Sequence, residues 1–122
     1  MTDINKIKNA IQTIASLNEA NANFSYEDWS IDYQLDLDKE LCGELAKLQI
    51  ELDLLANALQ EKDLVTAKCA LVMARLFSLN LSNFFLNIFE DIEKIGWSEE
   101  FKLPAIPEGY KIPEHYIYPS KK

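Results

Sequence analysis

Hydrophobic residues recur at helical spacing over most of the first 95 residues. The clearest case is a set of six leucines separated by alternating steps of four and three residues: Leu41, Leu45, Leu48, Leu52, Leu55 and Leu59. This heptad spacing places all six on one stripe of an α-helix. The polar residues 60–63 interrupt the pattern, and Asp63 suits the N-cap of a following helix. We therefore predict two antiparallel helices joined as a hairpin.

The helix after this break is predicted to be long. Apolar or small residues continue at steps of three and four up to Gly96, a residue suited to the left-handed position after a helix end: Leu64, Ala67, Leu71, Ala74, Ser78, Leu81, Phe85, Ile88, Ile92 and Ile95. The pattern does not decide between one helix over 64–95 and two helices with a break near residues 80–82. A second face is also apolar between Cys69 and Phe89, so a single neighbouring helix would not cover it.

A shorter helix is predicted near the amino terminus. Four isoleucines recur at steps of three, four and three, which places them on one stripe, and Thr2 or Asp3 can cap the helix: Ile4, Ile7, Ile11 and Ile14. Residues 24–35 alternate apolar and polar side chains. We interpret them as a linker that becomes helical near Asp36 or Asp38.

The carboxyl-terminal segment has a different composition. All four prolines lie in the last nineteen residues, among tyrosines and other large apolar residues. Prolines exclude a long helix there, and aromatic content is unusual for a disordered tail. The chain is therefore predicted to be all-α. We expect residues 1–96 to form an antiparallel hairpin with a packed N-terminal helix, as a three- or four-helix bundle. Residues 97–122 are expected to form an extended Pro/Tyr-rich tail packed on the bundle.

Residues 69–89 contain a single charged side chain, Arg75, and are long enough to suggest a membrane span. Several polar residues within the segment are costly in hydrocarbon, among them Asn80 and Asn83. We therefore expect a buried central helix and no membrane partner. The amino-terminal residues lack the features of a secretory signal, so we expect a cytoplasmic protein.

Acidic residues are concentrated in one short part of the chain. Residues 27–44 contain seven acids and one base, Lys39, and supply six of the eight net negative charges. Such asymmetry steers a protein toward basic surfaces and away from nucleic acid. We expect a partner-binding surface made of these acids and two aromatic residues among them: Glu27, Asp28, Trp29, Asp32, Tyr33, Asp36, Asp38, Glu40 and Glu44. Alternatively, the block is a solvated helix start, where acids are favoured by the helix dipole.

No pattern in the sequence predicts catalysis, a metal or a cofactor. The segment from Asp36 resembles the start of a calcium loop, but its sixth and twelfth positions carry Leu41 and Lys47 instead of glycine and glutamate. The single histidine, His115, lies in the proline-rich tail, so neither a di-iron bundle site nor a histidine-activated nucleophile is expected.

Three other residues invite a chemical role. In an antiparallel hairpin Cys42 and Cys69 are too far apart to form a disulfide, so we expect two reduced thiols. The single arginine, Arg75, lies in the most apolar part of the chain and could bind a carboxylate, or extend from the edge of a helix into solvent.

These patterns favour a binding protein over an enzyme. The first hypothesis is a small acidic protein that neutralises a cationic partner, such as a toxin or a nucleic-acid-binding enzyme, by occluding its basic site. The general character of the chain, small, acidic and helical with no catalytic pattern, is shared by immunity proteins, antitoxins and phage-type inhibitors. We expect no direct contact of this chain with nucleic acid. The alternative is a helical adaptor, a secretion chaperone or an oligomeric structural protein that uses the leucine seam, with a homodimer as one form.

Overall fold

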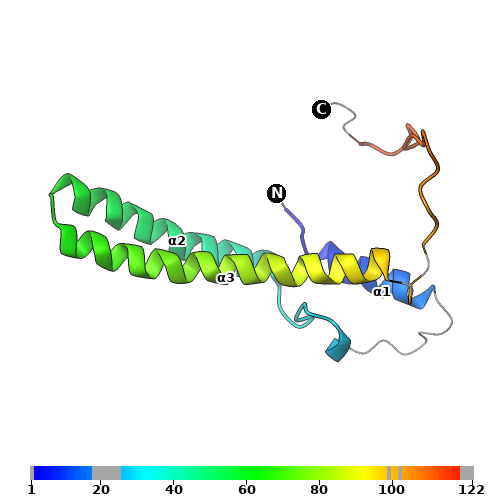
Figure 1. Cartoon of the computed structure of the whole chain (residues 1–122), viewed down its shortest axis with the longest axis horizontal. Coiled ribbons are helices and arrows are strands. Elements are labelled where there is room, and N and C mark those ends of the chain that lie inside the picture. Colours follow the sequence, from blue (N-terminus) through cyan, green and yellow to red (C-terminus); the bar gives the residue numbers. More distant parts are fainter. Residues whose placement is uncertain (1, 18–25, 99, 102, 119–122) are drawn as a thin grey trace.

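The computed structural model describes residues 2–17, 26–98, 100–101 and 103–118 (Figure 1). In this part of the chain there are three α-helices, α1 (Lys6–Ser16), α2 (Leu37–Gln60) and α3 (Leu64–Trp97), one turn of 3-10 helix, η2 (Tyr26–Asp28), and no strand. The predicted all-α class is confirmed. Residues 18–25, where the first helix was expected to end and the linker to begin, lie outside the described residues.

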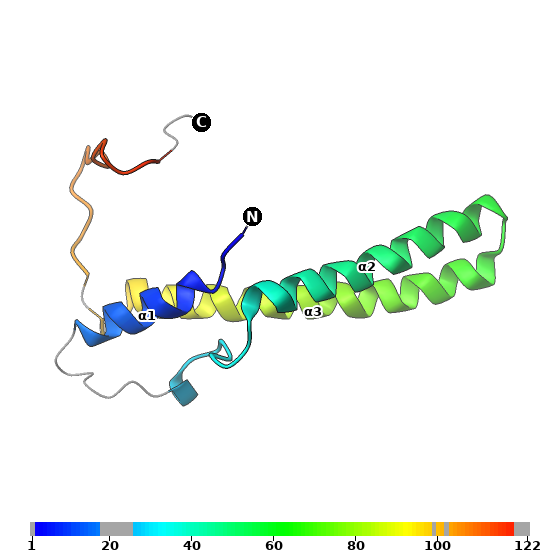
Figure 2. The same ribbon diagram turned by 180° about the vertical axis from the view of Figure 1, so that it is seen from behind.

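Helices α2 and α3 form an antiparallel hairpin, seen from two sides in Figures 1 and 2. The side chain of Asp63 caps α3 by accepting hydrogen bonds from the backbone N–H and the hydroxyl of Thr66, at 3.1 and 2.7 Å. Lys62 adopts the left-handed conformation, with φ of 61°, and this reverses the chain within three residues. At about 1.5 Å per residue, α2 is roughly 36 Å long and α3 roughly 51 Å.

Helix α3 is continuous through residues 80–82, but its buried edge differs from the predicted one at every second position. The residues that lie inside follow steps of three and four: Ala67, Ala70, Ala74, Phe77, Leu81, Phe84, Ile88, Asp91 and Ile95. The predicted residues Leu64, Leu71, Ser78, Phe85 and Ile92 are exposed. Small alanines let the two helices approach closely near the turn, and the larger residues beside them remain outside. The spacing of apolar residues alone does not show that the covered side of α3 is rotated from the predicted side.

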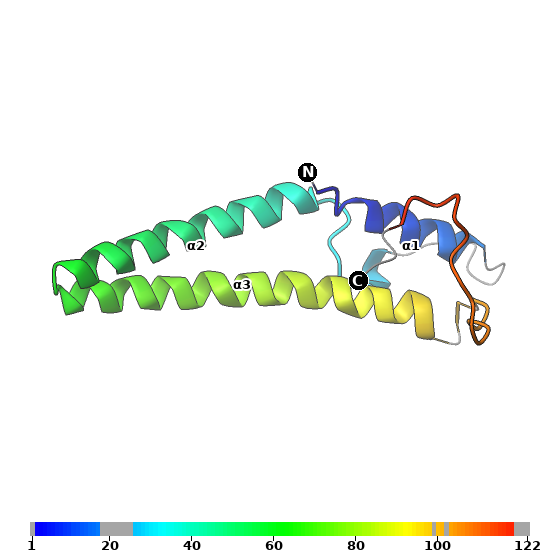
Figure 3. The same ribbon diagram turned by 90° about the horizontal axis from the view of Figure 1, so that it is seen from above.

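A second core lies beyond the hairpin, where α1 packs on the carboxyl-terminal part of α3. Figure 3 shows α1 and α2 lying one after the other along the same side of α3. The buried residues of this core come from α1, the linker, the ends of α2 and α3, and the start of the tail: Ile11, Ala15, Trp29, Ile31, Leu37, Ile95 and Phe101. Phe101 is the buried residue of the described tail, whereas residues 103–118 are exposed.

Candidate interaction surface

The amino-terminal ends of α1 and α2 meet at two aspartates. The Asp38 carboxylate accepts hydrogen bonds from the backbone N–H groups of Ile4 and Asn5, at 3.0 and 3.2 Å, and from the Asn5 side-chain amide at 2.9 Å. Asp36 caps α2 at the Lys39 N–H and also accepts from the Asn5 side chain, at 2.9 Å. These carboxylates therefore hold two helix starts together. Their negative charge also interacts favourably with the positive end of each helix dipole.

Asn5 returns the interaction by accepting a hydrogen bond from the backbone N–H of Leu37 at 2.8 Å. Hydrogen bonds from the Asn5 side chain and the Lys39 N–H lower the pKa of Asp36, and the N–H groups of Ile4 and Asn5 lower the pKa of Asp38. Both groups are thereby held as carboxylates. The Lys8 ammonium group donates to the carbonyl oxygens of Tyr33 and Leu35 and secures the end of the linker.

The middle of the linker is attached to α3 by a buried carboxylate. Asp91, which is only 2% exposed, accepts hydrogen bonds from the backbone N–H groups of Ser30 and Ile31, both at 2.8 Å. Lys94 donates to the Asp28 carbonyl oxygen at 2.8 Å, and its ammonium group lies 4.6 Å from the centre of the Trp29 ring. The linker is therefore a fixed structural element.

These contacts change the interpretation of the predicted acidic surface. Trp29 is buried, with its ring centre 5.6 Å from that of Phe101, and Tyr33 is half-buried beside the same core. Asp36 and Asp38 join the two helices, and Glu44 contacts Lys47 at 3.6 Å and Asn80 at 3.3 Å. Glu40 is half-buried, and the exposed acids among the nine are Glu27, Asp28, Asp32 and Asp36. The nine predicted residues thus lie in several environments, and most of the exposed acids are on the linker.

An exposed apolar surface lies on the hairpin itself. The six leucines of α2 alternate in burial: Leu41, Leu48 and Leu55 are half-buried, whereas Leu45, Leu52 and Leu59 are exposed by 48%, 43% and 51%. The seam predicted from the sequence is real, but α3 covers only every second residue in it. Heptad seams are filled on both sides in helical bundles, so this one is half covered.

The same alternation occurs on α3, where Leu64, Leu71 and Phe85 remain exposed between covered positions. In each helix the exposed residue lies four positions after a covered one. Because the helices are antiparallel, this step turns the exposed side chains of both helices toward the same side of the hairpin. We call the surface made of Leu45, Leu52, Leu59, Leu64, Leu71 and Ser78 the hairpin face.

The two helices present this face in matching layers. Glu44 contacts Asn80, and the Lys47 ammonium group lies 5.8 Å from the centre of the Phe77 ring. These two contacts fix the register of the antiparallel pair, because a step of three residues along α2 matches a step of three residues backward along α3. Within about one residue, this register places Leu59 level with Leu64, Leu52 level with Leu71, and Leu45 level with Ser78. The hairpin face is therefore a ladder of paired side chains.

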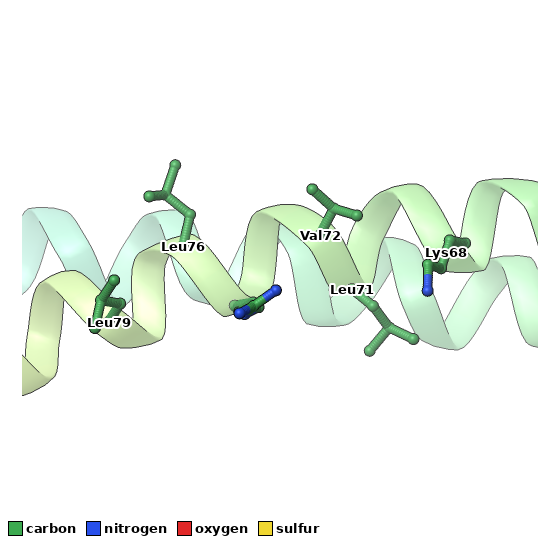
Figure 4. A pocket seen from close by; sticks show the side chains of 6 residues that line it. Lys68, Leu71, Val72, Leu76 and Leu79 are labelled. Carbon is green, nitrogen blue, oxygen red and sulfur yellow. The ribbon is translucent and has the colours of Figure 1, made fainter.

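The side of α3 that faces away from α2 is also apolar. It carries Val65, Val72, Leu79 and Leu86 at seven-residue intervals, all exposed. A shallow depression of about 460 Å³ lies on this side, lined by Lys68, Leu71, Val72, Arg75, Leu76 and Leu79. In Figure 4, Val72 and Leu76 project to one side of α3 and Leu71 to the other, so the side chains do not converge on a ligand. The predicted role of Arg75 as a carboxylate anchor has no partner group among these lining residues.

Helix α3 is long and apolar enough to cross a membrane by length and composition, and only 22% of its most apolar eighteen-residue window is buried. Among the described residues there is no group of three or more histidine, cysteine or acidic side chains placed to hold a metal ion. Cys42 and Cys69 are both free and exposed. The described parts of α2 and α3 thus expose apolar area that is available for binding.

Comparisons with family models, with curated proteins and with solved structures give no match to this chain. The functional argument therefore rests on the geometry of the chain itself.

Proposed function

We propose that the chain is a non-enzymatic helical adaptor that binds other polypeptides through the hairpin face. The observation that supports this function is the half-covered seam, in which the same seven-residue spacing leaves an exposed row on each helix. In an isolated hairpin this second row stays in contact with water and does not stabilise the fold. A hairpin that packs against further helices buries it in the manner of a bundle core.

The hydrophobic effect makes such a surface unfavourable in water. Burial of apolar area contributes about 25 cal/mol per Å², and a contiguous apolar patch of several hundred Å² on a soluble chain indicates an interaction site. The exposed leucines of α2 and α3 are contiguous because they lie level with one another. A protein partner also suits the rest of α3, since Arg75 and Asn83 are exposed between the apolar residues and can remain hydrated at the edge of a protein interface.

A site-specific photo-crosslink tests this function. The photoreactive residue p-benzoylphenylalanine is placed at Leu52 on the hairpin face or, as the control, at Ile50 on the same helix. Ile50 is 64% exposed, and its side chain points about 160° away from that of Leu52 around the helix axis. After irradiation in the source cells, we expect protein adducts at position 52 that are at least fivefold more abundant than at position 50. Equal yields, or no adduct at position 52, would contradict the function.

A second candidate function is neutralisation of a basic protein, supported by the exposed carboxylates of Glu27, Asp28 and Asp32 on the linker. The backbone that carries these groups is held by the contacts of Asp91 and Lys94 with residues 28–31, which favours a defined charged surface. Capture of basic proteins by the immobilised chain would fall steeply between about 50 and 300 mM salt. The E27Q/D28N/D32N variant provides the control. If it captures the same proteins as the native chain, this candidate fails.

A further inference from the structure

We infer that the hairpin face is covered by a second copy of this chain, and that the two hairpins form a four-helix bundle with both turns at the same end. This inference rests on the proposed function and names its partner. The surface is self-complementary, because leucines from α2 and α3 lie side by side at two of its three levels and Leu45 lies beside the small residue Ser78 at the third.

A twofold axis parallel to the helices gives the arrangement. Rotation by 180° about this axis places α2 of one copy opposite α3 of the other, antiparallel and at the same level. One layer then contains Leu59 and Leu64 from each copy, and the next contains Leu52 and Leu71 from each copy. The third contains Leu45 and the small residue Ser78. Each layer holds four side chains, as the core of a four-helix bundle requires.

The area is sufficient for a stable dimer. The apolar residues of the hairpin face are 43–69% exposed, Phe85 and Ile92 continue the exposed row along α3, and Phe89 is exposed beside them. Together these side chains offer on the order of 700 Å² per chain, close to the roughly 800 Å² per partner of a standard interface. Polar atoms at the rim add to this value.

Charge also favours a second copy. Helix α2 carries five acids and two bases, whereas residues 64–89 of α3 carry Lys68 and Arg75 and no acid. Neither base has an acidic residue three or four positions away on α3. In the twofold arrangement, α2 of the second copy brings the exposed Asp53 to the level between these two bases. Such rim pairs contribute little affinity, but they oppose the alternative alignments.

Sedimentation equilibrium of the full chain tests the inference. We expect a dimer with a dissociation constant of about 10 μM or lower, raised at least about 100-fold by L52Q together with L59Q. The matched variant I50Q, which removes an exposed apolar residue outside the hairpin face, should change the constant by less than about threefold. A native chain that remains monomeric at about 200 μM, or an I50Q variant that weakens the dimer equally, would overturn the inference.

A second measurement leaves the hairpin face intact and stays informative if the glutamine variants unfold. A spin label is attached at E61C beside the turn, with the exposed Cys42 and Cys69 replaced by serine. Two turns at the same end give a label separation of about 20–30 Å by pulsed electron paramagnetic resonance. Hairpins aligned with their turns at opposite ends give more than about 40 Å, since α2 alone is roughly 36 Å long. A distance in the longer range, or no dipolar coupling, would overturn the arrangement.

The photo-crosslink at Leu52 separates failure of this inference from failure of the proposed function. An adduct with twice the mass of the chain supports a second copy. Adducts of other masses alone retain the adaptor function and overturn self-association, and absence of adducts overturns both. A chain that sediments as a monomer and pellets with phosphatidylcholine vesicles would overturn both in favour of a lipid surface.

Discussion

Asp38 and Asn5 are 33 residues apart in the sequence, yet the Asp38 carboxylate accepts hydrogen bonds from both the backbone and the side-chain amide of Asn5, at 3.2 and 2.9 Å. Asn5 in turn accepts from the backbone of Leu37 at the start of α2. Two helix starts thus satisfy each other's unpaired N–H groups, which would otherwise need separate caps.

Removal of the Asp38 carboxyl group should detach α1 from α2. In D38A the N–H groups of Ile4 and Asn5 lose their acceptor, so we expect hydrogen exchange in residues 4–16 to accelerate at least about tenfold. The thermal midpoint should also fall by several degrees. The control is D53A, which removes an exposed α2 carboxylate bonded only locally, at 2.9 Å, to Gln49. If D53A and D38A give the same exchange pattern, the joint does not depend on Asp38.

Acid should weaken the same joint. Hydrogen bonding lowers the pKa values of Asp36 and Asp38 below the ordinary value of 3.8, so folding favours their ionised forms. Their contribution to stability is fully present above about pH 4 and is lost as the pH falls below that value through the folded-state pKa. Thermal melts between about pH 6 and pH 2.5 should therefore show a decline that is shallower in D36N/D38N. Parallel curves for the two proteins would contradict this assignment.

Asp91 should be essential for the linker. In D91A the N–H groups of Ser30 and Ile31 become buried without an acceptor, which costs about 2–4 kcal/mol in the free energy of unfolding. Urea denaturation measures this loss, and the emission of Trp29 in a W97F background should shift to longer wavelength as the ring becomes solvated. The exposed neighbour provides a control, E93A, for which we expect a change below about 0.5 kcal/mol.

The small residues between the hairpin helices should not tolerate enlargement. Ala70 is fully buried on the side of α3 that contacts α2, so A70L forces the helices apart and should cost about 1–3 kcal/mol. V72L adds a methylene group two positions away at a site that is 54% exposed, and it should be nearly neutral. Urea unfolding of both variants at one protein concentration provides the comparison. Equal stabilities would show that the helices are not closely packed at Ala70.

The sequence predicted the hairpin well because its signals are local. The leucine spacing and the capping potential of Asp63 lie within a few residues of the structures that they specify, and both are found. The sequence could not decide whether α3 is continuous, because the polar residues near 80–82 are also compatible with a break. In the structure Asn80 lies within the helix, and its side chain donates a hydrogen bond to Glu44, a partner that is distant in sequence.

The acidic residues were harder to interpret because their partners are distant in sequence. Asp38 binds residues 33 to 36 positions away, and no periodicity reports that distance. Trp29 was expected among the acids as an interface residue, but residues about 60 positions later fix its segment in the core. The exposed rows of the hairpin were contained in the predicted seams, but only the observed burial shows that alternate members remain uncovered.

Because one unbroken helix belongs to both cores, the chain is built as a lever. Helix α3 is held at its carboxyl-terminal end by α1, the linker and Phe101, and its other end carries the hairpin turn roughly 50 Å away. A tilt of only about 5° at the held end would swing the turn through about 4 Å, given that length. A small rearrangement around Asp91 would therefore displace the hairpin turn by more than it displaces the held end of α3.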